Sequence, residues 1–308
     1  MRQQLHNPVL LITLSNIGDA IMTTPVLQAL HTIYPGEKID IVADQRSSEI
    51  FFYCPFRGDI FIKDKKSFLR GVPDLLIKLR SRKYDLIVDL RTDGLAYLLR
   101  GRKILTKWNR KKNTRHAVQQ HMSVIAPIYN NKTIPECCIW TGQAEDHFAR
   151  LVLGDMPGKR ILALAPGANS QKKIWPVENY IELIKKLAGT IDTVVLLGNR
   201  QDGKLSKTIS TPPELPFLDL CGQTTILQAA AVLRHAMIFV GNDSGLGHIA
   251  AALGTPTITI FGPGDPERYR PWSGHSQYVV GDANDIKNAS VEAVTKCVFR
   301  RIEKTGNT

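Results

Sequence analysis

The sequence predicts a doubly wound α/β protein, in which strands and helices alternate along 308 residues. Short apolar runs at residues 9–14, 39–43 and 84–89 have the length and composition of buried strands. Residues 25–33 and 72–80 instead carry apolar side chains at helical spacing. This alternation is typical of largely parallel sheets covered by helices.

The second half of the chain repeats the alternation. Residues 161–164 and 193–197 are predicted strands, and residues 177–187 and 226–235 are predicted helices. Residues 290–304 form an expected amphipathic terminal helix that packs on a domain surface, with the first domain as an alternative packing partner. Each half is long enough, at about 150 residues, to build its own core.

Three segments set the expected domain organisation. Residues 100–115 are basic and lack periodicity, so we expect mostly loop, and residues 116–128 look helical. Composition breaks at residues 154–160, where we place a linker. The predicted domains are therefore residues 1–155 and 156–308.

Composition excludes several classes of protein. No apolar run approaches the ~18 residues of a membrane span, and the N-terminus has no convincing signal-peptide core. The five cysteines show no metal-binding or redox spacing and are expected to act as small hydrophobic residues in a reducing compartment. We therefore expect a cytoplasmic protein.

The positive charge is concentrated in one region. The net charge is +12, and residues 63–115 contain 17 Lys and Arg against 5 Asp and Glu. Such a local excess favours an acidic partner: nucleic acid, an anionic membrane surface, or a phosphorylated or carboxylated substrate. A solubilising surface is the alternative. Few aromatic residues and no nucleic-acid-binding module argue against nucleic acid.

Residues 239–262 are the most informative segment, because they predict a buried strand, a polar turn, a helix and a second buried strand. The turn is Asn242-Asp243-Ser244-Gly245, and these residue types start helices or allow close approach to the backbone. A helix N-terminus suits a phosphate or diphosphate, and His248 lies one turn further along the same face. The alternative is an ordinary helix cap with a buried histidine.

A second polar turn follows the first predicted strand and contains Asp19. A carboxylate at a helix N-terminus is stabilised in its ionised form, so Asp19 is a candidate general base. A helix cap is the competing interpretation. A G-x-G-x-x-G pattern is absent here, which disfavours a nicotinamide dinucleotide.

Two further loops carry candidate ligand contacts. Asn169, Ser170 and Lys173 follow the strand at residues 161–164 and offer hydrogen-bond donors and a positive charge for an anion. Asp202 follows the next strand and is a candidate acceptor for ribose hydroxyls. Clustered carboxylates of a divalent-metal site are absent from the motifs, so we expect no metal and no cofactor.

These segments together resemble the heptosyltransferase family, the glycosyltransferases that add heptose from ADP-heptose to the inner core of lipopolysaccharide. The resemblance is strongest over residues 17–35, 173–176 and 241–271 and extends over nearly the whole chain. It implies a GT-B fold, with two Rossmann-like domains facing an interdomain cleft. The acceptor would bind the first domain and the nucleotide sugar the second, for an inverting, metal-independent transfer.

The resemblance also implies roles for individual residues. Asp19 matches the catalytic base, and Lys173 matches a lysine that contacts the donor phosphates. Donor binding would further involve the residues of the turns described above: Asn169, Ser170, Asp202, Asp243, Ser244, Gly245 and His248. The family usually has Glu where Asp202 stands, and Gln228 replaces a usual acid.

Matches are faint between residues 45 and 135, on the expected acceptor side. We expect anion contacts from this basic region: Lys63, Lys65, Lys66, Arg100, Arg102 and Arg115. The predicted partners are ADP-heptose or a related nucleotide sugar and a phosphorylated lipopolysaccharide core, at the cytoplasmic face of the inner membrane. Alternatives are another nucleotide sugar, a protein acceptor, or a nucleotide-sugar-binding protein without turnover.

Overall fold

A computed structural model describes residues 8–63, 71–109, 114–131, 133–154 and 160–306. The chain divides into two compact units, Met1–Trp140 and Thr141–Thr308. The boundary between the units falls at residue 140, whereas the sequence prediction placed it at residue 155. Most of the predicted linker, residues 155–159, lies outside the described residues.

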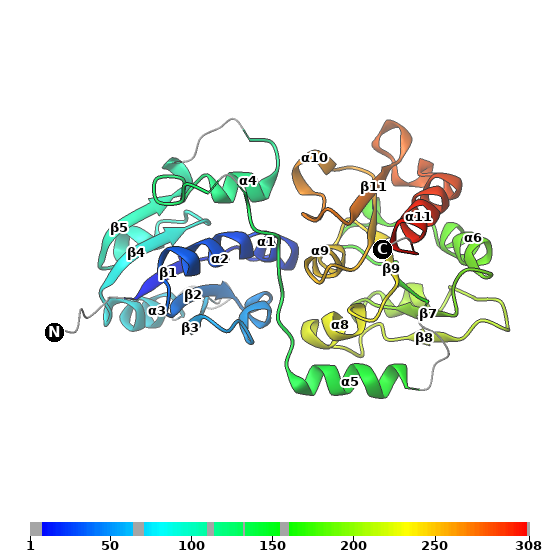
Figure 1. Ribbon diagram of the computed structural model, residues 1–308, viewed down its shortest axis with the longest axis horizontal. Helices are drawn as coiled ribbons and strands as arrows, with labels where there is room; N and C mark the ends of the chain where they lie inside the picture. Colours follow the sequence, from blue (N-terminus) through cyan, green and yellow to red (C-terminus); the bar gives the residue numbers. More distant parts are fainter. Residues whose placement is uncertain (1–7, 64–70, 110–113, 132, 155–159, 307–308) are drawn as a thin grey trace. The chain divides into compact units, whose positions relative to one another are not determined.

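The first unit contains a parallel five-stranded sheet in the order β3-β2-β1-β4-β5 (Figure 1). Val9 in the central strand pairs with Ile39 on one side and Leu86 on the other. The strands are β1 Val9–Ile12, β2 Ile39–Asp44, β3 Arg57–Lys63, β4 Tyr84–Asp89 and β5 Gly101–Thr106.

Short helical segments connect these strands. The segment after β1 is split into two helices, α1 and α2, and Pro25 occupies the first turn of α2, where its missing N–H leaves no hydrogen bond unmade. The helical elements are α1 Ile17–Ile21, α2 Thr24–Ile33, η1 Ser48–Phe51, α3 Gly71–Arg80, η2 Leu95–Leu98, η3 Lys107–Asn109 and α4 Ala117–Met122.

The prediction of loop over residues 100–115 is wrong for Gly101–Thr106, which forms the edge strand β5. Arg102 and Lys103 are exposed in this strand, so apolar periodicity could not reveal it. An edge strand tolerates such charges because only one of its sides is paired. The helix predicted over residues 116–128 is also shorter, since α4 ends at Met122.

The second unit contains a parallel six-stranded sheet in the order β11-β10-β9-β6-β7-β8. β6 and β9 lie at its centre, and all their residues are buried. The strands are β6 Ile161–Ala165, β7 Thr193–Leu196, β8 Phe217–Asp219, β9 Ile238–Asn242, β10 Thr257–Phe261 and β11 Ser276–Val280.

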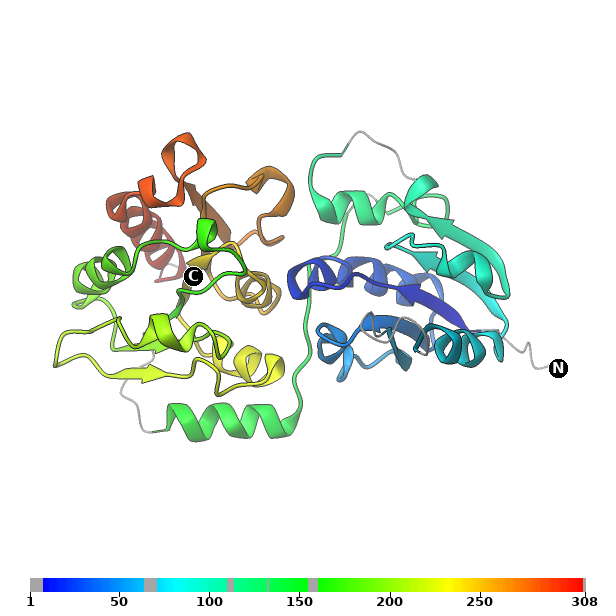
Figure 2. The same cartoon turned by 180° about the vertical axis from the view of Figure 1, so that it is seen from behind.

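The helices of this unit mostly follow the strands, as in other doubly wound sheets (Figure 2). The predicted helix over residues 177–187 has those bounds in the structure. The helical elements are α5 Gln143–Leu153, η4 Gln171–Lys173, α6 Val177–Leu187, α7 Gly203–Ser206, α8 Ile226–Leu233, α9 Gly245–Ala252, α10 Pro266–Tyr269, η5 Asp282–Asn284, η6 Ile286–Asn288 and α11 Val291–Gly306.

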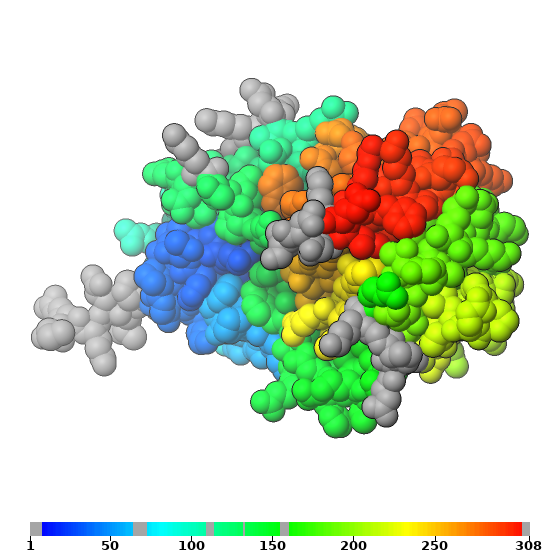
Figure 3. Space-filling model, turned by 45° about the vertical axis from the view of Figure 1, so that its right-hand side comes forward, coloured from blue at the N-terminus to red at the C-terminus, as the bar shows by residue number. Residues whose placement is uncertain are grey.

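The terminal helix α11 packs on α6, β10 and β11 of its own unit. Val291, Val294 and Val298 on its apolar face enter the same core as Trp175, which is fully buried. The Trp175 indole Nε1 donates a hydrogen bond to the Ala289 carbonyl at 2.8 Å. Figure 3 shows α11 in red beside the light green surface of this unit.

In both sheets the strands are parallel, so their carboxyl ends meet at one edge. Ligands of open α/β sheets bind outside this edge. The order of connections reverses at β1/β4 in the first unit and at β6/β9 in the second. The polar turns predicted from the sequence follow β1, β6 and β9, the strands at these two reversal points.

Candidate active site

The helix α9 begins immediately after β9, through the turn Asp243-Ser244. Ser244 is the N-cap residue in an extended conformation, but its side chain caps no backbone N–H. Within the described residues its buried Oγ atom has no hydrogen-bond partner. The first turn of α9 contains no acidic residue, so the positive end of its dipole is not neutralised there. The turn therefore offers N–H donors and a hydroxyl to an anion.

Lys173 lies against this turn. Its Nζ atom is 2.5 Å from Oδ2 of Asp243, and the two side chains are 28% and 15% exposed. The lysine ends the short η4 segment, 70 residues before its partner. Since an ammonium group has three donors, Lys173 can keep this ion pair and still donate to a bound phosphate.

Asn242 holds the loops of this site together. Its Oδ1 accepts hydrogen bonds from the Trp175 backbone N–H at 3.2 Å and from the Tyr180 hydroxyl at 3.0 Å. Its Nδ2 donates to the Pro166 and Gly167 carbonyls at 2.7 and 3.3 Å. The side chain is fully buried, and all four of its hydrogen-bonding positions are used. Asn242 thereby fixes the chain two residues after Lys173 relative to the start of α9.

The sequence analysis placed Asn242 in the polar turn as a helix-capping residue type, whereas the structure places it at the end of β9 as a partner of other loops. The sequence feature that could have revealed this role is an amide side chain at the end of an otherwise apolar strand. A polar residue in such a run needs internal partners when buried, so the residue type itself pointed to a structural hydrogen-bond hub.

His248 lies in α9 and is 6% exposed. It follows Ser244 by one helical turn, as the sequence spacing predicted. Asn169 and Ser170 are exposed in the loop after β6, and Ser170 is the N-cap of η4. These residues belong to the same unit as Lys173 and the start of α9.

Asp202 lies in a notch formed by two glycines. A Cβ atom on Gly167 would approach the Asp202 carboxylate to 2.1 Å, and one on Gly198 would also collide with its side chain. The carboxylate accepts a hydrogen bond from the Asn199 N–H at 2.8 Å. Burial raises the pKa of Asp202, and this hydrogen bond opposes the shift. Gln228, which replaces the usual family acid, accepts from the Thr225 N–H in a capping box at the start of α8.

Asp19 is in the first turn of α1, at the carboxyl end of β1. Its Oδ2 atom accepts a hydrogen bond from Nδ2 of Asn16, the N-cap residue, at 2.9 Å. The side chain is half-buried and retains accessible surface. Asp19 thus has the local position predicted for it, after the central strand of the first sheet.

The same edge of the first sheet carries a network of charges that the sequence analysis did not identify. Arg91 connects Asp44 and Asp93, with N–O distances of 3.8 and 3.1 Å, and its side chain is 10% exposed. Asp93 also accepts from Lys63 at 2.5 Å. Asp89 at the end of β4 accepts from the N–H groups of Arg91 and Thr92.

These contacts shift the pKa values of the carboxylates in different directions. Burial raises the pKa of Asp93, but the hydrogen bond and charge of Lys63, together with Arg91, outweigh it and leave the pKa below its usual range. Burial also raises the pKa of Asp44, and hydrogen bonds from Arg46 reverse that shift. For Asp89, which is fully buried, the raising effect of burial prevails.

The predicted acceptor residues have diverse environments. Lys63 is engaged by Asp93, and its side chain is only 14% exposed. Arg100, Arg102 and Arg115 are exposed. Lys65 and Lys66 lie outside the described residues. Contact of these six basic residues with an acceptor stays a prediction.

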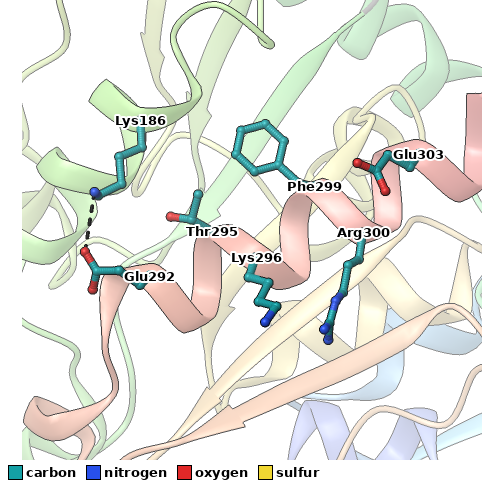
Figure 4. Close-up of a pocket in the computed structure, with 7 residues that line it drawn as sticks. All are labelled: Lys186, Glu292, Thr295, Lys296, Phe299, Arg300 and Glu303. Carbon is teal, nitrogen blue, oxygen red and sulfur yellow. Dashed lines mark ion pairs between the residues drawn. The ribbon is translucent and has the colours of Figure 1, made fainter.

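Among the described residues of the second unit, hollows also occur beside the residues named above. One, of about 410 Å³, lies between α6 and α11 and is lined by Lys186, Glu292, Thr295, Lys296, Phe299, Arg300 and Glu303. Figure 4 shows Lys186 reaching toward Glu292, while Lys296 and Arg300 project from the other side of α11. The other, of about 400 Å³, includes Gln171 and Lys172 and so adjoins the η4 segment that carries Lys173.

Comparison with known proteins identifies the family. Residues 91–298 match the model of glycosyltransferase family 9 (heptosyltransferase). The chain belongs to this family. It is therefore a glycosyltransferase of the heptosyltransferase type, which confirms the family predicted from the sequence.

Individual relatives agree with this assignment. The chain is 28% identical to lipopolysaccharide heptosyltransferase 3 of Escherichia coli, over 87% of this chain and 88% of the relative. Its fold is similar to that of E. coli ADP-heptose lipopolysaccharide heptosyltransferase II, with a TM-score of 0.80 and 20% identity over 97% of this chain and 99% of the other. E. coli heptosyltransferase WaaC with ADP gives a TM-score of 0.76 at 21% identity, over 96% and 99%. These likenesses confirm the predicted GT-B class with two Rossmann-like domains.

Two features are absent from the part of the chain that the structure describes. None of the helices there is both long and apolar enough to cross a membrane. In the same part of the chain, three or more His, Cys, Asp or Glu side chains do not gather in a group that could hold a metal ion.

Proposed function

We propose that this glycosyltransferase transfers heptose from ADP-heptose to a phosphorylated inner-core acceptor of lipopolysaccharide, with inversion and without a metal ion. The observation that carries the proposal is the Lys173–Asp243 pair beside the start of α9, where the buried Ser244 Oγ has no partner among the described residues. This arrangement supplies a cation, a hydroxyl and helix N–H groups to a diphosphate. The names of the relatives supply the identity of the sugar and of the acceptor.

In this proposal the donor-site residues have different roles. Lys173 and the α9 N-terminus stabilise the negative charge that grows on ADP as the glycosidic bond breaks. Asp243 positions the lysine and remains available to sugar hydroxyls. Asp202 accepts hydrogen bonds from the ribose, and Asn169, Ser170, Gly245 and His248 complete the donor site.

Asp19 acts as the general base on the acceptor. Its half-buried carboxylate accepts only the Asn16 amide among the contacts described above, which leaves an oxygen for the attacking hydroxyl. A positioned base contributes about 10²- to 10⁴-fold to such a reaction. The proton of the acceptor hydroxyl moves to Asp19 as the new carbon–oxygen bond forms and ADP leaves.

The acceptor determines where the enzyme works. A lipid-anchored, phosphorylated acceptor places the reaction at the cytoplasmic face of the inner membrane, with the enzyme bound there peripherally. The basic region that includes Lys63, Lys65, Lys66, Arg100, Arg102 and Arg115 supplies charges that attract acceptor phosphates. Nucleic acid is not a partner in this proposal.

The proposal is tested by incubating the enzyme with ADP-heptose and a panel of truncated core acceptors, with the new linkage identified by mass spectrometry. Inversion requires the product anomer to be opposite to that of the donor, and activity should persist in EDTA. Products formed only from another nucleotide sugar, or on a protein, would contradict the donor or the acceptor assignment.

Asp19→Ala should lower kcat by about 10²- to 10⁴-fold, because the base is removed. The affinity for ADP, measured by calorimetry, should change less than twofold. Asp19→Asn keeps the size and the hydrogen bond to Asn16, so an equal loss in this variant separates loss of the base from misfolding. Near-normal turnover in either variant would show that Asp19 is not the base.

A further inference from the structure

Three large side chains are exposed in the first unit, close to the end of its edge strand. Tyr97 and Leu98 belong to η2 and are 59% and 53% exposed, and Trp108 belongs to η3 and is 75% exposed. Large apolar side chains that cluster on a surface mark interaction sites more often than single ones do. The donor site and the proposed base use none of the three.

Tyr97, which is next to Leu98 in η2, and the backbone of Trp108 meet at one threonine. The Tyr97 hydroxyl is 3.4 Å from Oγ1 of Thr106, the last residue of β5, and the same oxygen accepts the Trp108 N–H at 3.3 Å. The η2 segment packs on β4 and β5 through Leu95 and Ala96, which are buried. Its inner side is therefore in the core, and Tyr97 and Leu98 are left on the outside.

The surroundings of this surface are positively charged. Arg100, Arg102 and Lys103 are exposed at the start of β5. In the sequence, residues 94–135 contain nine Lys and Arg but no Asp or Glu. A protein surface that combines exposed aromatic and aliphatic side chains with unopposed cations is complementary to an anionic bilayer, whose headgroups attract the cations and whose interface accepts Trp and Tyr.

We propose that the surface formed by Tyr97, Leu98 and Trp108, named here the η2–η3 surface, docks on anionic phospholipid. Trp108 and Leu98 enter the interface, and Tyr97 remains at headgroup level with its hydroxyl near Thr106. The basic residues of β5 add long-range attraction, which salt screens. This inference rests on the proposed function, because a lipid-anchored acceptor requires the enzyme to work at a bilayer.

The test is co-sedimentation of the full chain with vesicles of phosphatidylethanolamine and phosphatidylglycerol at a 3:1 ratio, and with pure phosphatidylcholine vesicles. We expect binding to the anionic vesicles that falls at least tenfold between 50 and 500 mM NaCl. Leu98→Ser combined with Trp108→Ser should weaken it about tenfold, and Lys103→Glu severalfold.

Matched controls come from the second unit. Leu151→Ser removes a leucine that is 66% exposed on α5, and Lys296→Glu reverses a charge on α11. Both controls should bind vesicles as the unmodified protein does. Equal binding by all variants, or binding of the unmodified protein to neither type of vesicle, would overturn the docking proposal.

A second measurement separates insertion from simple attraction. Vesicles that contain brominated lipid should quench tryptophan fluorescence in the unmodified protein, and Trp108→Phe should abolish most of this quenching while leaving binding in place. Quenching that persists in Trp108→Phe would show that another tryptophan meets the lipid and would contradict the assignment of Trp108.

The failure of this proposal can be distinguished from failure of the proposed function. A deacylated, water-soluble core acceptor needs no bilayer, so Leu98→Ser with Trp108→Ser should transfer heptose to it at the normal rate. A loss of transfer to the soluble acceptor would show that this surface binds the acceptor glycan, which would overturn lipid docking but retain the transferase. Selective capture of single-stranded RNA in place of vesicles would overturn it as well.

Discussion

The carboxyl edges of the two sheets are stabilised in different ways. In the second unit the edge is organised around Asn242, a neutral amide with four hydrogen bonds, and one ion pair lies beside it. In the first unit the edge is organised by charges, with Arg91 between Asp44 and Asp93 and with Lys63 on Asp93. The same architecture thus supports an edge fixed by neutral hydrogen bonds in the second unit, the proposed donor side, and an ionic edge in the first unit, the proposed acceptor side.

The difference has a physical consequence. Hydrogen bonds between neutral buried groups are insensitive to salt and to pH, because no charge is screened or titrated. Partly exposed ion pairs weaken with salt and when a carboxylate is protonated. The hydrogen bonds of Asn242 should therefore persist over a wider range of salt concentration and pH than the ion pairs around Arg91 do.

The largest effect is expected at the donor site. Lys173→Met should lower kcat/KM about 10²- to 10³-fold, since it removes the cation that stabilises the leaving diphosphate, a loss of about 3–4 kcal/mol in the transition state. Steady-state kinetics with ADP-heptose measures this. Lys172→Met, next to it in η4 and exposed, should lower kcat/KM less than threefold. Equal losses in the two variants would remove the special role of Lys173.

The second-largest effect is expected on the stability of the second unit, when Asn242 is replaced. Asn242→Leu leaves the Trp175 N–H and the Pro166 and Gly167 carbonyls without their buried partner, and should reduce the free energy of unfolding by about 3 kcal/mol. Hydrogen exchange followed by mass spectrometry should show faster exchange in the second unit and little change in the first. A variant of normal stability with tight ADP binding would show that the amide is dispensable.

The smallest effect is expected in the ionic network. The pKa of Asp93 is lowered on folding, so its contribution to stability is present above the unfolded pKa of about 3.9 and is lost as the pH falls through the lower folded value. Asp93→Asn should therefore reduce stability at pH 7 by about 1 kcal/mol or less, and by almost nothing once the pH is below the folded pKa of Asp93.

The pair itself can be isolated with a double-mutant cycle of Asp93→Asn and Lys63→Met, followed by thermal unfolding at both pH values. A coupling energy that is present at pH 7 and absent at low pH is expected. A coupling that is independent of pH would mean that the hydrogen bond, and not the charge, stabilises this edge.

The sequence predicted the family, the fold class and most central strands, because β1, β6 and β9 are continuous apolar runs that periodicity detects. The edge strand β5 was missed because its outward residues, among them Arg102 and Lys103, break that pattern. Helix α4 was predicted too long because apolar residues beyond Met122 continue the spacing after the helix ends.

For the site, local signals were sufficient where a motif is contiguous, as in Asp243-Ser244-Gly245. The network of Asp44, Arg91 and Lys63 could not be predicted, because its members come from β2, β3 and the end of β4 and meet only after the sheet has formed. The sequence shows that Asn242 is a polar residue at the end of an apolar run. It does not show which groups Asn242 binds, since its four partners lie 62 to 76 residues away.

The hydrogen bond from the Trp175 indole N–H to the Ala289 carbonyl connects the C-terminal part of the chain to the segment that carries Lys173. Trp175 is two residues after Lys173, and Ala289 lies two residues before the start of the last helix. We expect a truncation or a bulky C-terminal fusion that displaces this helix to loosen the segment that carries Lys173, the proposed phosphate-binding residue. Under that proposal, the C-terminal helix helps to position the group that stabilises the departing ADP.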